Sequence, residues 1–264
     1  MYERKPESDE KELLDSVPWT TQQTFRGVLF TIIPWIVFAL ALTSLNGQST
    51  ATAKPLATGV DLTGAIVTFI FSVIIEGAFL IAPLYYANKA FRSITPHIRL
   101  ALQALGLRSF SPIQALGWIV VLLLGIFAVN NLYSYVISVL HLNIQTNDQV
   151  LLAHSKNAPL TTYATLIAAV IVAPICEEIF FRGFVFAGLC RSMPVGWAIV
   201  LSALIFATTH ADPGSFIVLF VIGLALAFLR WRTHSLWPGM MLHALNNGAA
   251  ALLIVLIMNG VVKG

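Results

Sequence analysis

The sequence predicts an all-α polytopic membrane protein with about seven transmembrane helices and an additional interfacial helix. Of its 264 residues, 58% are hydrophobic and only 10% are charged, whereas soluble domains carry about 25% charged residues. The mean hydropathy is +0.83. The apolar residues also occur in runs close to the ~20 residues with which a helix crosses the hydrocarbon core. Together these observations exclude an ordinary soluble domain.

The apolar runs divide the chain into spans and a tail. The seven predicted helices are 27–46, 62–87, 113–140, 161–190, 195–210, 215–232 and 236–259. Residues 1–26 carry six acidic and four basic residues without an apolar core, so we expect a solvated cytoplasmic tail rather than a secretory signal. Residues 27–160 then form an N-terminal three-span segment, and residues 161–264 form a C-terminal helical core.

One polar connection between spans also has a helical pattern. The segment from His97 to Pro112 places apolar residues at helical spacing beside Arg99 and Arg108. This pattern is typical of an amphipathic helix that lies in the membrane interface. We therefore expect an interfacial helix between the second and third spans.

The basic residues of the loops alternate in number along the chain. From the tail to the C-terminus, successive connections hold four, one, four, one, two, none, two and one Lys or Arg, when Arg182, Arg230 and Arg232, which lie inside spans, are counted with the connection that follows them. By the positive-inside rule this pattern predicts a cytoplasmic N-terminus and a C-terminus across the membrane. The net charge is +3, and the basic residues are spread along the chain rather than clustered in one segment. We therefore expect membrane lipid as a partner and no nucleic acid.

Three acidic residues, Glu76, Glu177 and Glu178, fall inside predicted spans. An ionisable group at mid-bilayer costs about 2.5 kcal/mol or more, which makes each a candidate functional residue. Glu178 and Arg182 are neighbours at i, i+4, where an ion pair forms, whereas Glu177 points about 100° away from Glu178. We predict that Arg182 holds Glu178 and leaves Glu177 free to react. A purely structural triad is the alternative, and Glu76 is expected to pair with Arg182 or a histidine, or to line the cavity.

Two histidines and an asparagine complete the candidate site. His210 ends the fifth span, and His243 and Asn247 share one face of the seventh. Glu177 and His210 each lie about sixteen residues from the turn at 192–194, so helices of equal rise bring them to the same depth. His243 lies about 12 Å from its own turn, against about 24 Å for Glu177. The two meet only if the first hairpin projects beyond the second turn, or if helices tilt.

These residues suit the hydrolysis of a peptide bond within the membrane. A carboxylate and an imidazole that face one water molecule can remove its proton and produce a nucleophile for an amide carbonyl. His243 and the Asn247 amide would then donate to the developing oxyanion. The set Glu177, His210 and His243 is also a candidate His2Glu zinc site. The spacing leaves both versions open, and we favour the metal-free one.

Three motifs occur in order on three hydrophobic segments. EEIFFR at 177–182 fits EExxxR, FATTH at 206–210 fits FxxxH, and HALNN at 243–247 fits HxxxN. This order resembles the CPBP (Abi) family, which includes intramembrane endopeptidases of the CAAX prenyl protease 2 type. The resemblance covers about residues 160–260.

The resemblance implies a catalytic site made of six motif residues: Glu177, Glu178, Arg182, His210, His243 and Asn247. It implies that Glu177 activates water with His210, that His243 and Asn247 stabilise the oxyanion, and that the remaining two support the site. It also implies that the last four spans form a catalytic core whose cavity opens to the cytoplasmic side. The substrate would be a membrane-associated peptide or protein, which can be lipidated, and the cofactor would be none or, alternatively, Zn²⁺.

Two functions of other classes compete with this interpretation. One is a proton-coupled transporter that uses Glu76 and Glu177 as a relay, although the sequence shows no internal repeat of the kind that transporters carry. The other is a non-proteolytic membrane adaptor or bacteriocin-immunity protein built on the same scaffold. Neither predicts that peptide cleavage depends on Glu177.

Overall fold

The computed structural model describes residues 17–46, 56–93 and 97–262. Within these residues every regular element is a helix, which confirms an all-α polytopic membrane protein. Five helices of this part of the chain are long and apolar enough to cross a membrane: Thr58–Ala78, Pro112–Val139, Pro159–Leu189, Phe216–Thr233 and Trp237–Met258. Val195–Thr209 is a shorter apolar helix.

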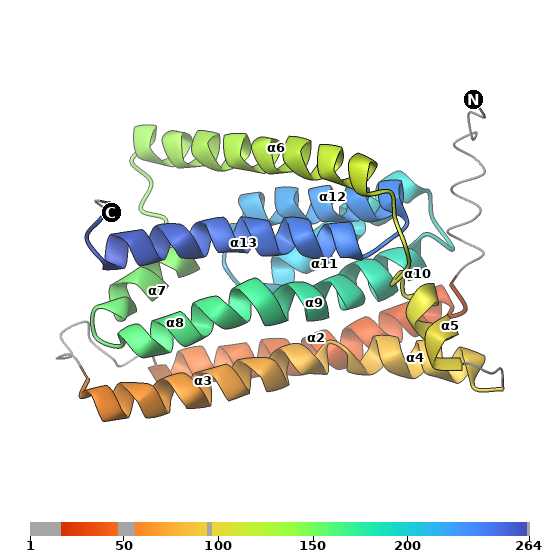
Figure 1. Ribbon diagram of the computed structural model, residues 1–264, viewed down its shortest axis with the longest axis horizontal. Coiled ribbons are helices and arrows are strands. Elements are labelled where there is room, and N and C mark those ends of the chain that lie inside the picture. The colour runs from red at the N-terminus through yellow and green to blue at the C-terminus, as the bar shows by residue number, and fades with distance from the viewer. Residues whose placement is uncertain (1–16, 47–55, 94–96, 263–264) are drawn as a thin grey trace.

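The first half of the chain forms six helices that precede the motif-bearing segment. They are α2 (Thr21–Asn46), α3 (Thr58–Ala78), α4 (Ile81–Phe91), α5 (His97–Ala104), α6 (Pro112–Val139) and α7 (Asn147–Ser155). Helices α4 and α5 lie at one end of the elongated bundle, and α7 lies at the other (Figure 1).

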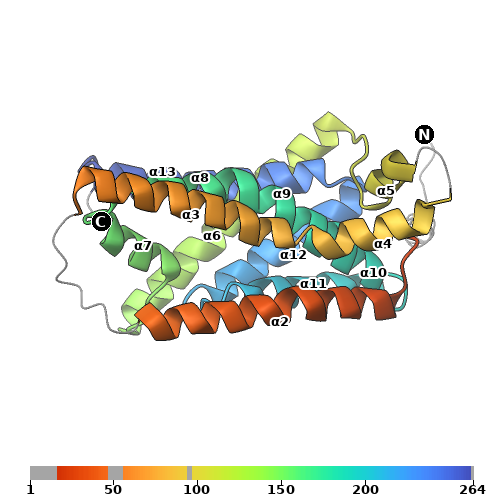
Figure 2. The same cartoon turned by 90° about the horizontal axis from the view of Figure 1, so that it is seen from below.

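The second half contains one long helical run followed by three helices. The run consists of α8 (Pro159–Ile167), η1 (Ala168–Val172), α9 (Ala173–Glu177), η2 (Glu178–Phe186) and α10 (Ala187–Leu189), in which η1 and η2 are π-helical. Then follow α11 (Val195–Thr209), α12 (Phe216–Thr233) and α13 (Trp237–Met258). The run contacts α2, α3, α4, α11, α12 and α13, so it forms the centre of the bundle (Figures 1 and 2).

The predicted second span is two helices rather than one. Helix α3 ends at Ala78 and α4 begins at Ile81. The reason is Pro83, whose ring clashes with the carbonyl of residue 79 and which has no N–H to donate to it. The amides of Phe79 and Leu80 instead donate to the carbonyls three residues earlier, both at 3.0 Å. The prediction of one unbroken helix over 62–87 was therefore wrong.

Three other features also differ from the sequence prediction. Helix α2 begins at Thr21 rather than at residue 27, and the preceding Trp19 is buried, with its indole N–H donating to the Phe184 carbonyl at 3.2 Å. Helix α5 covers only the first half of the expected interfacial segment. The unpredicted α7 starts with a capping box between Thr146 and Gln149. A short polar helix of this kind leaves no apolar signal in the sequence.

The π-helical turns lie on either side of the first motif glutamate. Pro174 is the second residue of α9, just after η1, and the helical run continues through it. A wider π turn accommodates the missing proline N–H without breaking the helix. All nine residues of η2, from Glu178 to Phe186, are buried. Because π turns occur frequently at functional sites, this segment is a candidate functional site.

Candidate active site

Glu178 and Arg182 form the fully buried centre of the candidate site. Oε1 of Glu178 lies 2.9 Å from Nη1 of Arg182, and neither side chain is exposed. Nη2 of Arg182 donates to the Gly223 carbonyl of α12 at 3.3 Å. The guanidinium carbon lies 4.3 Å from the centre of the Phe206 ring. The predicted ion pair is confirmed, and it links η2 to α11 and α12.

His243 of α13 lies beside both motif glutamates. Its Nδ1 is 3.3 Å from Oε1 of Glu178, and its Nε2 is 3.9 Å from Oε2 of Glu177. A carboxylate oxygen accepts, so Nδ1 donates to Glu178, and the longer separation to Glu177 exceeds a direct hydrogen bond. Oε2 of Glu177 and Oε2 of Glu178 both have no hydrogen-bond partner in the described part of the chain. The difference between the two glutamates is that Oε1 of Glu178 is bound by Arg182 and His243, whereas Glu177 makes only the longer approach to His243.

The packing of α13 explains how His243 reaches this depth. A Cβ on Gly183 would lie 3.3 Å from Leu236, just before α13, and a Cβ on Gly239 would lie 2.8 Å from Oε2 of Glu178. Helix α13 thus begins level with Gly183, and the run continues past it to Leu189. The first hairpin therefore projects beyond the second turn, which is one of the two arrangements that we expected to bring Glu177 and His243 together.

Gly239 is a position at the candidate site that the sequence analysis did not identify. Its missing side chain lets the backbone of α13 approach Glu178 closely, since an added Cβ would lie 2.8 Å from the carboxylate. Small residues are typical of close helix contacts in membranes. That preference is the signal that could have marked Gly239, which lies four residues before His243.

His210 presents a basic nitrogen at the end of α11. Its ring centre lies 4.6 Å from that of Phe206, which in turn lies 5.8 Å from that of His243. Nδ1 of His210 bonds to the Phe206 carbonyl at 2.8 Å. Because a carbonyl only accepts, Nδ1 must carry the proton, and Nε2 keeps its lone pair. No ion pair or direct hydrogen bond joins His210 to Glu177 among the described residues.

His210 and Glu177 do not lie at quite the same depth. The Ser202 hydroxyl donates to the Phe181 carbonyl at 3.3 Å, which places these two residues level. Counting four residues onward along each antiparallel helix, Glu177 is level with Phe206, and His210 lies about one turn deeper. The prediction assumed equal rise in both helices. A π-helix advances less per residue than an α-helix, so η2 brings Glu177 closer to its turn.

Asn247 lies one turn after His243 and ties α13 to η1. Its Nδ2 donates to the Ala169 carbonyl at 2.9 Å, and its Oδ1 accepts from Asn246 at 3.3 Å. A side-chain amide has two N–H groups. The bond to Ala169 uses one of them, so the second can still donate to another acceptor.

A third carboxylate lies near the site. Glu76 of α3 is close enough to Glu177 for the two carboxyl groups to interact electrostatically, and its Oε2 is buried without a hydrogen-bond partner in the described residues. The pairing with Arg182 or a histidine that we considered is not formed in the described chain. Glu76 therefore places a third carboxyl group near Glu177 without occupying a motif position.

The arrangement does not fit the zinc site that the sequence left open. In the part of the chain that the structure describes, no three His, Cys, Asp or Glu side chains are placed to hold a metal ion.

Comparison with known proteins points to one family. A family model described as "Type II CAAX prenyl endopeptidase Rce1-like" matches residues 159–249, which include all three motifs. The "Putative membrane peptidase YdiL" of Bacillus subtilis (strain 168) is 33% identical over 101 residues, which cover 38% of this chain and 40% of that protein. The matched segment thus spans less than half of this relative.

No solved structure matches the chain significantly. The family match and the relative together support a membrane protease. The family match lies over the helices that carry the glutamates, the histidines and Asn247, and the resemblance expected from the motifs is confirmed there. Residues 159–249 of this chain are accordingly similar to the family described as type II CAAX prenyl endopeptidase Rce1-like.

Proposed function

We propose that the chain is an intramembrane endopeptidase that hydrolyses a peptide bond with water activated by Glu177 and His210. The observation that carries the proposal is the difference between two adjacent glutamates. Oε1 of Glu178 is bound by both Arg182 and His243, whereas Glu177 only approaches Nε2 of His243, at 3.9 Å. Oε2 of each glutamate has no hydrogen-bond partner in the described residues. Two carboxylates in different environments can take different roles in one reaction.

In the proposed reaction, Glu177 acts as the base and later as the acid. It takes one proton from water while the water oxygen bonds to the substrate carbonyl carbon. Nε2 of His210, about one turn deeper, accepts a hydrogen bond from the same water and orients it. When the carbon–nitrogen bond breaks, Glu177 returns its proton to the leaving amine. The water is thereby divided between the new carboxyl group and the new amine.

The oxyanion would be stabilised from α13. When the carbonyl carbon becomes tetrahedral, its oxygen gains a negative charge that needs donors. The second N–H of the Asn247 amide and the ring of His243 lie on the face of α13 that contacts η1 and the motif glutamates. Because Nδ1 of His243 donates to Glu178, the ring would donate to the oxyanion through Nε2 when both of its nitrogens carry a proton. Glu178 and Arg182 would hold His243 in place and would not react themselves.

We propose a membrane-associated protein or peptide as the substrate. The description of the matched family and the name of the Bacillus relative support a peptide substrate at the membrane. The substrate can be lipidated, and the positive-inside pattern favours a cavity open to the cytoplasm. No metal takes part in this proposal, and metal analysis of the active preparation tests that.

The experiment compares purified wild type with Glu177→Gln on membranes of the source organism. Released peptides are identified by mass spectrometry, and metal content is measured on the same preparations. Wild type should release peptides that are missing after incubation with Glu177→Gln, because glutamine cannot accept the water proton. If Glu177→Gln releases the same peptides at the same rate, Glu177 is not the base.

A further inference from the structure

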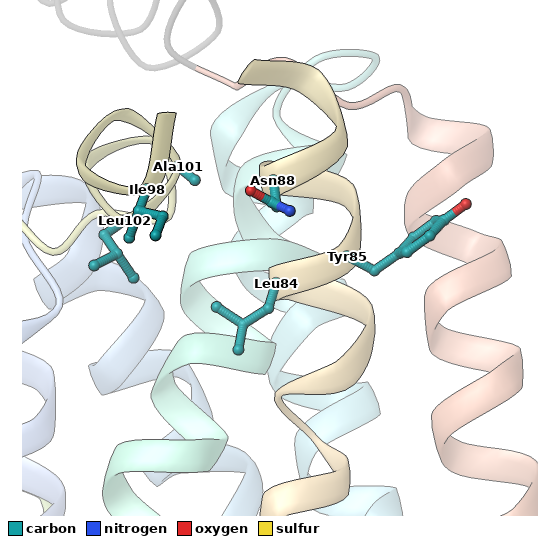
Figure 3. Close-up of a pocket in the computed structure, with 6 residues that line it drawn as sticks. All are labelled: Leu84, Tyr85, Asn88, Ile98, Ala101 and Leu102. Atoms are coloured by element: carbon teal, nitrogen blue, oxygen red, sulfur yellow. The ribbon is translucent and has the colours of Figure 1, made fainter. Parts of the chain in front are cut away.

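A preformed pocket lies between α4 and α5. It has a volume of about 440 Å³ and is lined by Leu84, Tyr85 and Asn88 of α4 and by Ile98, Ala101 and Leu102 of α5. Leu84 and Asn88 lie on the side of α4 that faces α5, and Tyr85 extends from its other side (Figure 3). Asn88 is the only lining residue with a polar amide. The interior therefore suits a hydrocarbon chain, with one hydrogen-bonding group at its edge.

Both walls of the pocket are fixed to the bundle. Tyr86 of α4 stacks on Phe184 with ring centres 5.7 Å apart. After α5, Leu105 is fully buried, and the next carbonyl, that of Gly106, accepts from the Leu236 amide at 2.9 Å. The pocket is thus part of the folded structure, and a ligand would not have to order either wall.

Cationic side chains lie on the two helices that line the pocket. Arg92 follows Asn88 by four residues, as Asn88 follows Leu84, so these three share one face of α4. Arg99 adjoins Ile98 on α5, and Lys89 lies 5.7 Å from the centre of the Tyr85 ring. All three cations are exposed, and none forms an ion pair in the described residues.

No carboxylate in the neighbouring sequence neutralises this edge. The chain has no Asp or Glu between Glu76 and Asp148. Leu84 and Ile98 meanwhile remain 42% and 62% exposed. An apolar pocket with basic residues on both of its helices is complementary to a molecule with a hydrocarbon tail and an anionic head. In a membrane, this description fits an anionic glycerophospholipid.

We propose that this pocket binds an anionic glycerophospholipid. An acyl chain lies between Leu84 and Leu102, the phosphate contacts Arg92 and Arg99, and the Asn88 amide donates to the headgroup. The site lies at the end of the bundle that carries α4 and α5 (Figure 1), where the sequence predicts the cytoplasmic surface. Anionic lipids are enriched on that side of a membrane. The proposal does not depend on the chain being a protease.

Native mass spectrometry of the full chain in detergent tests the proposal. Phosphatidylglycerol and phosphatidylcholine with identical acyl chains are titrated, and the bound fraction is measured for each. Wild type should prefer phosphatidylglycerol. Replacing both Arg92 and Arg99 by Gln should weaken its binding by at least about fivefold for each residue, since a basic residue near anionic lipid contributes about that factor. Binding of phosphatidylcholine should not change.

Two further variants separate the pocket from general charge attraction. Asn88→Asp keeps the shape of the side chain and adds a negative charge at the edge, so it should weaken phosphatidylglycerol binding by about fivefold. Arg232→Gln removes an exposed cation that lies over Trp118 and Trp231 instead, and it should leave lipid binding unchanged. Unfolding temperatures confirm that each variant is folded.

Three results would overturn the proposal. Wild type could bind both lipids equally, Asn88→Asp could retain full affinity, or Arg232→Gln could weaken phosphatidylglycerol binding as much as the double variant. The last result would mean that net charge alone attracts the lipid.

Discussion

The run from α8 to α10 and helix α6 are both apolar enough to cross a membrane, yet they occupy opposite environments. All nine residues of η2 are buried, whereas α6 buries only three of its 28 residues, Ala115, Ile119 and Ile126. The run contains Glu177, Glu178 and Arg182, and α6 contains no charged residue. Exposing a charged side chain to lipid costs free energy. The charged residues therefore identify which of these two apolar spans lies in the core.

The largest expected effect comes from replacing His210 of the candidate active site. His210→Gln should lower peptide cleavage by about 10²-fold, because glutamine does not place an acceptor where Nε2 of His210 would orient the attacking water. Initial rates on a cleaved peptide measure the effect. His154→Gln is the matched control, since exposed His154 on α7 makes the same kind of Nδ1 bond to the carbonyl four residues earlier, at 2.8 Å. Equal loss in both variants would remove the special role of His210.

The next effect concerns the stability of the buried charges. Arg182→Met should cost about 3–5 kcal/mol of unfolding free energy, because it leaves Glu178 buried with one partner fewer. Asn130→Leu on the exposed surface of α6 should change it by less than about 0.5 kcal/mol. Unfolding by denaturant in detergent micelles measures both. Similar values for the two variants would contradict the contrast between core and lipid-facing spans.

Two glycine substitutions, one in η2 and one in α6, test the same contrast with a smaller expected effect on stability. A Cβ on Gly183 of η2 would lie 2.7 Å from the backbone carbonyl oxygen of Leu105, whereas a Cβ on Gly125 of α6 would have nothing within 4 Å. Gly183→Ala should therefore destabilise the fold by about 1–3 kcal/mol. Gly125→Ala should stabilise it slightly, by up to ~1 kcal/mol, because alanine favours a helix. Thermal unfolding of both variants would show the opposite signs, and equal shifts would contradict the packing.

Local patterns in the sequence predicted much of the fold and part of the site. Apolar runs located the spans, and the i, i+4 spacing predicted the ion pair between Glu178 and Arg182. The break before Pro83 was not predicted, although that proline was visible, because a proline can also be accommodated within a helix, as Pro174 is. The short polar helix α7 lacked an apolar pattern.

Features that depend on packing between helices were harder to predict. The contact of His243 with both glutamates depends on how far one hairpin projects past another, which spacing along one helix does not determine. The depth of His210 was offset by about one turn because η2 is π-helical, and no local signal predicted that. Which side of the membrane the site faces stays a prediction from the loop charges.

The most direct test of the account substitutes the two adjacent glutamates separately. Glu177→Gln and Glu178→Gln are compared with wild type for peptide cleavage and for unfolding free energy in the same detergent. We predict that Glu177→Gln abolishes cleavage at unchanged stability, whereas Glu178→Gln weakens the fold because it disrupts the bonds to Arg182 and His243. Cleavage at the wild-type rate by folded Glu177→Gln would contradict the account.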